Sequence, residues 1–309
     1  MRIPAATTVT LRVPASSANL GPGFDCVGIA LGVWDECTVT VTREPGVVIE
    51  VSGSGADSVP RDESHLVVRT MTFAWQQLGV EPPSGLHLSA VNAVPHGRGL
   101  GSSATAIVTG VAAAHALAVR GGALTGDELD LCVINTIACA LEGHPDNASA
   151  SVFGGATLSV TDADQPLPHT RTVPLGIHGQ ITPVVLVPDT TLSTQTARSV
   201  LPEVVPLATA AANSARTGLL VHALTNEPGL LVEATTDFLH QEARRPSYPQ
   251  SMDLVDALRE GGFAATISGA GPSVLVLTTI DRVDGVRPLV PSGWRILTPG
   301  VPARGVTVV

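Results

Sequence analysis

The sequence is most informative at Val94-Pro-His-Gly-Arg-Gly-Leu-Gly-Ser-Ser-Ala104, where a glycine-rich loop joins the start of an uncharged segment. Gly97, Gly99 and Gly101 alternate, and two serines follow them. Glycine lets a backbone approach a ligand closely. A helix that begins directly after the loop adds unpaired N–H groups and the positive end of its dipole. The stretch therefore predicts an anion site, and phosphate is the anion most often bound in this way.

Other interpretations of the glycine loop fit less well. A plain glycine-rich turn before a helix needs no ligand and stays open on this stretch alone. A dinucleotide-binding loop has the pattern Gly-x-Gly-x-x-Gly, with an acidic residue about 20 positions later. Here the third glycine comes one residue early, and Asp127 lies beyond the expected place.

A lysine-dependent phosphate site is excluded, because all 17 basic residues are arginine. A P-loop requires Gly-x-x-x-x-Gly-Lys-Ser/Thr, which this chain cannot supply. The same absence excludes Schiff-base chemistry, including covalently bound pyridoxal phosphate. Any phosphate must therefore be held by backbone N–H groups, hydroxyls, arginine and a metal.

Composition narrows the class of protein further. A length of 309 residues predicts two domains or one large one, and a hydrophobic fraction of 44% is ample for a core. The net charge of −10 argues against nucleic acid or an anionic membrane as a partner. Residues 99–119 carry no charge and are long enough to cross a bilayer. Their small side chains, with His115 and no aromatic belt, favour a buried helix.

The cysteines and the N-terminus predict a cytoplasmic protein. Cys26, Cys37, Cys132 and Cys139 show no Cys-x-x-Cys spacing, and four scattered cysteines fit a reducing compartment. The N-terminus lacks a basic segment followed by an apolar one, so we expect no signal peptide.

Strand-like and helix-like stretches intermix without a regular βαβ repeat, which favours the α+β class. We expect a polar loop at residues 16–24 and a hairpin that joins strands 38–42 and 47–51. We also expect a helix opened by a capping box at Thr125–Glu128, a strand at 152–160, a linker at 161–179 and a helix at 230–240.

Three further polar clusters are candidates for chemistry: residues 14–25, 142–147 and 267–273. A tight turn, a helix exit and a glycine turn are their plain structural alternatives. Within the second cluster, Glu142 is suited to Mg²⁺, which prefers carboxylate and phosphate oxygens. Zinc is less favoured, because His144 is the only nitrogen ligand there. Arginine's planar fork suits a carboxylate, so Arg198 and Arg244 are candidate carboxylate clamps, although either can equally be structural.

Residues 95–104 resemble the phosphate loop of the GHMP kinases, whose acceptors include galactose, homoserine and mevalonate. Residues 14–25, 142–147, 193–198, 237–244 and 268–272 are similar to motifs of the branch that phosphorylates homoserine. These motifs span nearly the whole chain in the family's order, which is far more specific than one glycine loop.

The resemblance implies a two-domain GHMP kinase fold. Residues 1–170 would form an ATP-binding domain like domain 2 of ribosomal protein S5, with the phosphate loop at 94–104. Residues 171–309 would form a ferredoxin-like C-terminal domain, with ATP and the acceptor between the two. The implied reaction is ATP + L-homoserine → ADP + O-phospho-L-homoserine, a step of threonine biosynthesis, and we expect a homodimer.

The resemblance also implies roles for individual residues. Asn19 would orient the acceptor hydroxyl, Asp25 would bind the ammonium group, Asn147 would contact the amino-acid end, Thr194 would line the site, and Arg198 and Arg244 would bind the carboxylate. Ser103 and Glu142 would hold Mg²⁺ and, with Asn19 and Asp25, form the catalytic set. The phosphates of ATP would be wrapped by Pro95, His96, Gly97, Arg98, Gly99, Leu100, Gly101, Ser102 and Ser103.

The chain departs from the family pattern at two positions. His65 stands where members often have an asparagine next to the adenine, and Glu142 lies closer to the His-x-Asp-Asn segment than the magnesium glutamate of some members. Two alternatives remain. A sister kinase for mevalonate or a sugar would have no need of two arginines and an acid aimed at an amino acid. A non-catalytic small-molecule sensor would have no need of Glu142 and the loop serines.

Overall fold

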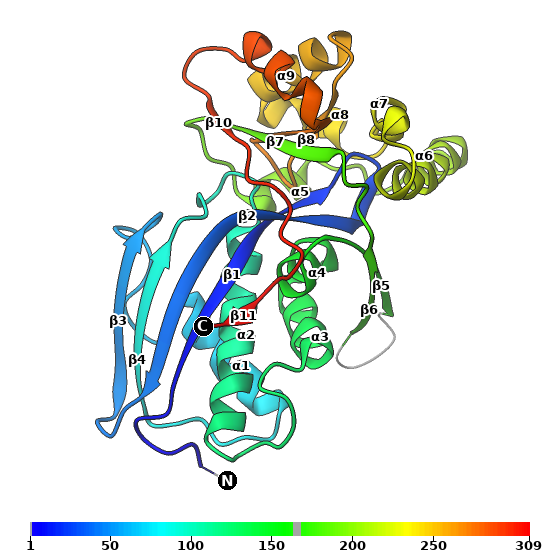
Figure 1. Cartoon of the computed structure of the whole chain (residues 1–309). Coiled ribbons are helices and arrows are strands. Elements are labelled where there is room, and N and C mark those ends of the chain that lie inside the picture. Colours follow the sequence, from blue (N-terminus) through cyan, green and yellow to red (C-terminus); the bar gives the residue numbers. More distant parts are fainter. Residues whose placement is uncertain (1, 163–167) are drawn as a thin grey trace.

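The structure is a computed structural model that describes residues 2–162 and 168–309 (Figure 1). The described residues form two sheets with helices packed on them, which confirms the α+β class. The first sheet contains β1 (Thr8–Asn19), β2 (Gly23–Val41), β3 (Gly46–Gly53), β4 (Gly85–Asn92), β5 (Ala156–Asp162), β6 (His169–Leu175) and β11 (Thr307–Val308). The second contains β7 (Ile181–Val187), β8 (Ala264–Ile267), β9 (Val274–Thr279) and β10 (Arg295–Leu297).

The helices divide between the two sheets (Figure 1). The first sheet packs against α2 (Ser102–Arg120), α3 (Leu131–Glu142) and α4 (Pro145–Phe153), and α1 (Leu66–Gln77) packs on α2 and α3. The rest of the chain contains α5 (Thr194–Ser199), α6 (Leu207–Thr225), α7 (Leu231–Ala234), α8 (Gln241–Arg244) and α9 (Pro249–Glu260). Short 3₁₀ helices lie at Pro228–Leu230, Arg245–Ser247, Ile280–Gly285 and Arg287–Leu289.

The strand order of the first sheet corrects the hairpin expected around residues 44–46. The order is β11-β1-β2-β4-β3, so β4 lies between β2 and β3. Strand β4 pairs antiparallel with β2 and parallel with β3. Leu86 and Leu88 of β4 are almost fully buried, whereas Val48 of β3 is 57% exposed. The more buried strand takes the central position, and β3 becomes the edge.

The loop expected at residues 16–24 is mostly strand. Strands β1 and β2 pair along almost their whole length, and only a tight turn separates Asn19 from Gly23. Asn19 and Leu20 have left-handed backbone angles, with φ of 70° and 48°. Such angles are uncommon outside glycine and are maintained by the surrounding structure. The long hairpin reaches out of the first sheet towards α6, where Asn213 donates a hydrogen bond to the carbonyl of Pro22 (Figure 1).

Helix α2 is the central helix of the first half. Ser102–Arg120 is the one described helix that is long and apolar enough to cross a membrane by length and composition, and 78% of its most apolar window is buried inside the protein. It packs against α1, α3 and β1, and Val108, Val111 and Leu117 belong to the larger hydrophobic core. Because its side chains are small, other elements approach it closely, and the Trp75 indole of α1 donates a hydrogen bond to the carbonyl of Ala114.

Helices α3 and α4 differ from the expectations on both sides of residue 143. Asp130 caps α3 by accepting hydrogen bonds from the backbone N–H groups of Cys132 and Val133, so the capping box at 125–128 was wrong. Gly143 ends α3 in a left-handed conformation, and Pro145 opens α4 two residues later. A glycine after one helix and a proline at the first position of the next are favourable. The strand expected at 152–160 therefore starts only at Ala156.

The second sheet is buried on both faces. Along β7, Val184 and Leu186 point to a core shared with α9, whereas Val185 and Val187 point to a core shared with α6, α7 and the far end of the β1–β2 hairpin. This is the two-residue alternation of a strand. The hairpin thus forms part of the core beneath the second sheet.

The linker expected at 161–179 contains a strand instead. Strand β6 pairs antiparallel with β5, and residues 163–167 of the expected linker lie outside the described part. The division into 1–170 and 171–309 falls within β6 and stays a prediction. The helix expected at 230–240 was also wrong beyond Ala234, because Asp237 accepts backbone hydrogen bonds from residues 239–241 and starts a new turn.

Candidate active site

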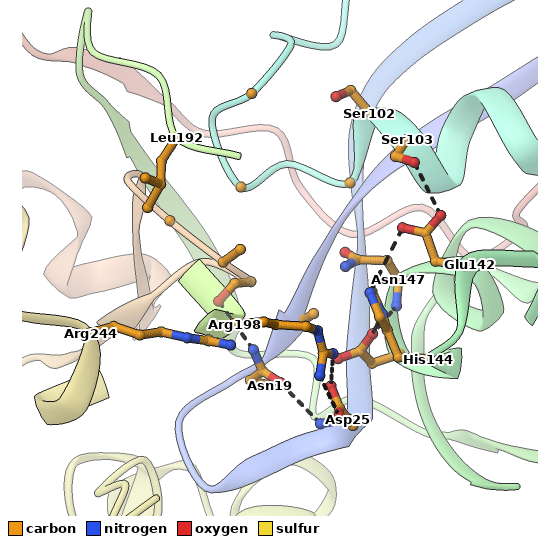
Figure 2. A pocket seen from close by; sticks show the side chains of 18 residues that line it. Asn19, Asp25, Ser102, Ser103, Glu142, His144, Asn147, Leu192, Arg198 and Arg244 are labelled. Carbon is orange, nitrogen blue, oxygen red and sulfur yellow. Dashed lines mark hydrogen bonds and ion pairs between the residues drawn. The ribbon is translucent and has the colours of Figure 1, made fainter. Parts of the chain in front are cut away.

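The glycine loop, the β1–β2 turn, the starts of α2 and α4 and the end of α5 meet at one pocket (Figure 2). The residues expected in the site that line it are Asn19, Asp25, Gly97, Gly99, Gly101, Ser102, Ser103, Glu142, Asn147, Arg198 and Arg244. Seven others join them: Ala18, His144, Asp146, Leu192, Gly269, Ala270 and Gly271. In the view of Figure 2, Glu142 and Arg244 enter this pocket from opposite sides.

The glycine loop is fixed by both halves of the protein. The backbone carbonyl of Leu100 accepts a hydrogen bond from Ser16 of β1, and that of Gly99 accepts one from the Ser268 hydroxyl at the end of β8. Gly99 has a φ of +72°, and a Cβ there would lie 2.2 Å from the Ser268 carbonyl oxygen. Only glycine fits this position, so the alternation of glycines reflects close packing of the loop as well as its exposure to a ligand.

Part of the loop lies behind the pocket rather than in it. Pro95, His96, Arg98 and Leu100 do not line the main pocket. The Arg98 guanidinium donates to the backbone carbonyls of Pro188 and Asp189, at 2.9 and 2.8 Å. Arg98 therefore holds the loop against the end of β7 in this structure.

Ser103 and Glu142 place a hydroxyl oxygen and a carboxylate oxygen next to each other at one side of the pocket. Ser103, in the first turn of α2, donates a hydrogen bond of 3.1 Å to Glu142 Oε2 at the end of α3. Burial raises the pKa of Glu142, although His144 and the Ser103 hydroxyl oppose the shift. A hydroxyl and a buried carboxylate beside a helix N-terminus are donors that suit Mg²⁺ and its phosphate ligands.

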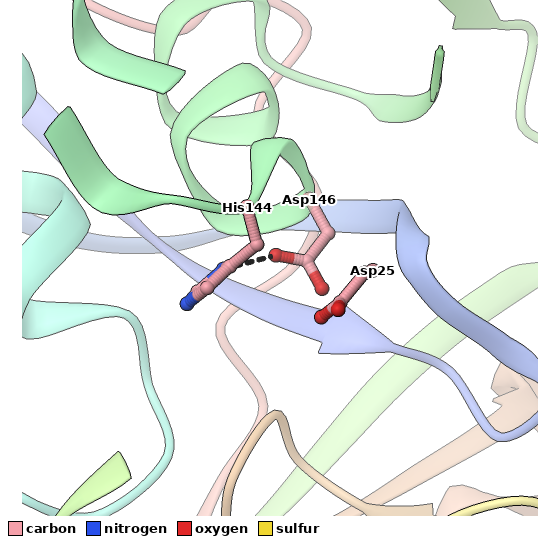
Figure 3. Close-up of side chains that lie close together, drawn as sticks. All are labelled: Asp25, His144 and Asp146. Carbon is pink, nitrogen blue, oxygen red and sulfur yellow. Dashed lines mark hydrogen bonds and ion pairs between the residues drawn. The ribbon is translucent and has the colours of Figure 1, made fainter. Parts of the chain in front are cut away.

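His144 lies beside Asp146, and Asp25 lies on the other side of that carboxylate (Figure 3). The Nδ1 of His144 is 2.9 Å from Asp146 Oδ1, and its Nε2 is 4.0 Å from Glu142 Oε1. Burial by itself lowers the pKa of His144, but the hydrogen bond and the charge of Asp146 outweigh it, and the net shift is upward. Asp25, His144 and Asp146 lie close enough for a metal, yet each carboxylate already has a partner: Asp25 binds Arg198, and Asp146 also accepts from the Asn147 N–H.

Asn19, Asp25 and Arg198 are linked in a chain. The Asn19 amide donates to the Gly269 carbonyl and accepts from the Asp25 N–H, both at 3.1 Å. The Arg198 guanidinium binds both carboxylate oxygens of Asp25, at 3.1 and 2.5 Å. Thr194, also expected here, is the first residue of α5, and its side chain lies outside what the structure describes.

Arg244 is a buried cation without an acidic partner. Its side chain is among the largest that are fully buried, and its Nε donates to the Ala197 carbonyl at 2.9 Å. Among the described residues, no carboxylate lies within 4.0 Å of it. Burial raises the pKa of the neighbouring Tyr248, so this phenol is neutral and supplies no negative charge. An unpaired buried charge is costly, and such a group calls for an anionic ligand.

A second, more apolar pocket shares Gly97, Ser102 and Ser103 with the first. His65 and His96 line it, together with apolar residues of α1, α2 and β4. His65 is 6% exposed, and its buried Nδ1 has no hydrogen-bond partner among the described residues. Burial, with Arg61 and His96, lowers the pKa of His65, which favours its neutral form.

Comparison with known proteins agrees with this geometry. The GHMP kinases N terminal domain family matches residues 65–155, and the GHMP kinases C terminal family matches residues 220–287. Homoserine kinase of Streptomyces coelicolor is 45% identical over 303 residues, which are 98% of this chain and 95% of that protein. The homoserine kinase of Rhodococcus opacus is 49% identical and covers 90% of this chain and 89% of its own. The solved structure of homoserine kinase from Cytophaga hutchinsonii has a TM-score of 0.84 at 26% identity and covers 98% of both chains.

The fold and the site thus define a GHMP kinase, and the chain belongs to this family of ATP-dependent kinases. The expected two-domain GHMP kinase fold is confirmed. Within the family, the chain belongs with the homoserine kinases, which match it over nearly its whole length.

Proposed function

We propose that the protein transfers the γ-phosphoryl group of ATP to the side-chain hydroxyl of L-homoserine, yielding O-phospho-L-homoserine for threonine biosynthesis. Arg244 carries the proposal: this buried guanidinium, to which no described residue offers a carboxylate, lies beside the Asp25–Arg198 ion pair in one pocket. A zwitterionic amino acid supplies the anion that Arg244 lacks. The family membership of the chain gives independent support.

The Asp25–Arg198 pair would be divided by the substrate. In this structure the two side chains neutralise each other. In the proposed complex, Asp25 binds the ammonium group, and Arg198 turns with Arg244 to the carboxylate, so that no charge is left unpaired. Asn19 orients the hydroxyl, and Asn147, whose Oδ1 accepts from Ser16, contributes its amide N–H groups to the acceptor end.

The donor would lie across both pockets, with its phosphates at Gly97–Ser103 and its base beside His65. The loop N–H groups and the N-terminus of α2 stabilise negative charge there. Phosphoryl transfer depends mainly on such positioning and electrostatics. Glycine backbone, rather than Arg98, therefore bears most of the phosphate contact.

The chain offers Mg²⁺ a suitable corner at Ser103 and Glu142. Bound there, Mg²⁺ would neutralise charge on the phosphate oxygens. Burial raises the pKa of Glu142 because it disfavours the charged carboxylate, so a nearby cation would stabilise that carboxylate.

No protein side chain is assigned as general base. Asp25 is a poor base while it is paired with Arg198 or an ammonium group. We infer direct transfer, in which the hydroxyl proton passes to phosphate or solvent. An Asp25→Asn variant that lost rate while keeping its affinity for L-homoserine would count against this inference.

The test measures ADP release by purified protein with Mg²⁺ and ATP, comparing L-homoserine, L-threonine, L-serine, mevalonate and galactose. We expect turnover with L-homoserine that stops when Mg²⁺ is chelated. Turnover with another alcohol instead would favour a sister kinase, and nucleotide binding without turnover would favour the sensor.

We further propose that the protein acts in the cytoplasm as a homodimer, without a nucleic-acid or membrane partner. All four cysteines are free, which suits a reducing compartment. Light scattering on the purified protein tests the dimer.

A further inference from the structure

Arg244 owes its orientation to His240, a residue of no assigned role. The two side chains project from neighbouring turns, and Arg244 Nη1 lies 3.2 Å from His240 Nδ1. Together with the bond from Nε to the Ala197 carbonyl, this contact fixes the plane of the guanidinium. The Phe24 ring closes the arrangement: its centroid is 5.2 Å from that of the His240 ring and 5.7 Å from the Arg244 guanidinium carbon.

The contact defines the protonation of His240. A guanidinium has only donors, so Nδ1 must accept and carries no hydrogen. The hydrogen is then on Nε2, which lies 2.9 Å from the Gly21 carbonyl and donates to it. One neutral tautomer satisfies both contacts, and the imidazolium satisfies only the contact with Gly21.

The surroundings of His240 favour this neutral form. The side chain is 1% exposed, and burial lowers its pKa. Three charged groups face it: Arg244 from α8, Asp25 from β2 and Asp237 from the preceding turn. Asp237 is 3.6 Å from Nε2, but its carboxylate already accepts the backbone N–H groups of Leu239, His240 and Gln241.

His240 also connects the two ends of the acceptor site. Gly21 belongs to the tight turn that carries Asn19 and Asp25, and Arg244 lies across the pocket from Glu142 (Figure 2). The imidazole ring of His240 therefore connects Arg244, which is proposed to bind the carboxylate, to the turn beside Asn19 and Asp25, which are proposed to bind the hydroxyl and the ammonium group.

We propose that His240 is a positioning residue which, as the neutral Nε2-protonated imidazole, fixes Arg244 in the orientation that receives the carboxylate of the acceptor. The inference rests on the proposed function. It makes the selection for acceptors with a carboxylate depend on a residue that does not touch the substrate.

Two carboxamide variants test the proposal. In His240→Asn, the side-chain oxygen lies near the place of Nδ1 and can accept from Arg244; in His240→Gln, the amide reaches the place of Nε2 and can donate to Gly21. We expect the KM for L-homoserine to rise about tenfold or more in His240→Gln and less than about threefold in His240→Asn, since hydrogen bonds to charged groups are the stronger class. The KM for ATP should stay the same in both.

A substrate without the carboxylate shows which group is affected. We expect 3-aminopropan-1-ol, which keeps the hydroxyl and the ammonium, to be a poor acceptor whose kcat/KM is the same in His240→Gln and the wild type. The matched control is His115→Gln, because His115 is also buried and hydrogen-bonded but lies towards the other end of α2 from Ser102 and Ser103. It should leave both KM values unchanged.

The remaining outcomes decide between the two proposals. If the wild type acts on L-homoserine but the two carboxamide variants raise its KM equally, or impair 3-aminopropan-1-ol equally, the role of His240 is refuted while the function stands. If the wild type neither binds nor phosphorylates L-homoserine, both proposals fail.

If His240→Gln does not fold, the dependence of KM on pH gives a second test. Because burial lowers the pKa of His240, the KM for L-homoserine should rise in the wild type as pH falls below the ordinary imidazole range and should rise less in His240→Asn; equal profiles refute the proposal.

Discussion

At the scale of single residues, each of the two pockets contains a buried polar side chain that lacks a matching partner within the described chain. Arg244 lacks a carboxylate, and His65 Nδ1 lacks any hydrogen-bond partner within the described chain. Buried polar atoms are nearly always paired in folded proteins. We infer that an anion binds beside the first and propose that a polar edge of the nucleotide base binds beside the second.

Replacement of His65 should weaken the nucleotide and spare the acceptor. We expect His65→Leu to raise the KM for ATP about tenfold, because one hydrogen bond to the base is lost, and to leave the KM for L-homoserine unchanged. His65→Asn should restore part of the affinity, since its amide can still bond to the base. Binding of a fluorescent ATP analogue measures the effect without turnover, and unaltered binding in His65→Leu would place the base elsewhere.

Sequence patterns predicted the residues of this site that stand in short motifs, and missed those that act across the fold. Asn19, Asp25 and Arg198 were found through their motifs. His240 reaches Gly21, which is 219 positions away in the sequence. No local pattern contains that distance, so the contact appears only when the second half of the chain folds against the β1–β2 turn.

At the scale of elements, local chemistry predicted the phosphate loop and helix α2 well, because the glycines and the small apolar residues that follow act within a few positions. Pairing between distant strands was not predictable in this way. Residues 38–42 and 47–51 both form strand, but β4 comes between them after a crossover that includes α1. The order of strands depends on which strand buries most apolar surface, which is a property of the whole sheet.

Substitutions of Gly99 and Gly122 distinguish the effect of close packing from that of backbone strain. Both have a φ of +72°, but a Cβ at Gly122, after α2, meets nothing within 4 Å. We expect Gly122→Ala to cost about 1–2 kcal/mol for its left-handed backbone and to keep full activity. Gly99→Ala adds the clash with Ser268 and should abolish transfer. Thermal unfolding and ADP release measure the two effects; an active Gly99→Ala enzyme would contradict the packing argument.

The cap of α3 gives a second test at this scale. Asp130→Ala removes the two hydrogen bonds to the first turn and should cost about 1 kcal/mol. Thr125→Ala, at the position first expected to be the cap, should leave the unfolding midpoint unchanged. Equal effects of the two substitutions would show that the cap lies elsewhere.

At the scale of the whole molecule, the site exists because two sheets share the glycine loop. Ser16 holds Leu100 from the first sheet, Ser268 holds Gly99 from the second, and Leu192 donates its N–H to the Gly97 carbonyl. The resemblance to a family predicted this architecture, whereas composition and periodicity predicted only its class. The pocket's shape depends on the relative placement of the halves, which no single motif encodes.

Asp35 should make the stability of the whole molecule depend on pH. It accepts a hydrogen bond from the Val94 N–H at 2.8 Å, where the glycine loop begins, and burial raises its pKa from 3.8 to about 6. The folded state therefore binds this proton more tightly than the unfolded state. Its contribution to stability is present below pH 4 and is lost as pH rises to about 6, by on the order of 3 kcal/mol.

Asp35→Asn removes this titration and keeps an oxygen that can accept from Val94. We expect the unfolding midpoint of the variant, relative to the wild type, to increase between pH 4 and pH 6 and to stay higher at pH 7. A difference between the two proteins that is constant over this range would show that Asp35 is charged in the folded state throughout.

Because of the buried guanidinium of Arg244, thermal stability and catalytic activity favour different residues at this position. A folded protein without substrate must keep a desolvated cation in place, and replacing buried charge with apolar side chains often stabilises proteins. We expect Arg244→Met to melt at a higher temperature than the wild type and to lose acceptance of L-homoserine. Directed evolution that selected for heat resistance alone would therefore replace arginine at this position. The selected variants would be more stable but would no longer phosphorylate L-homoserine.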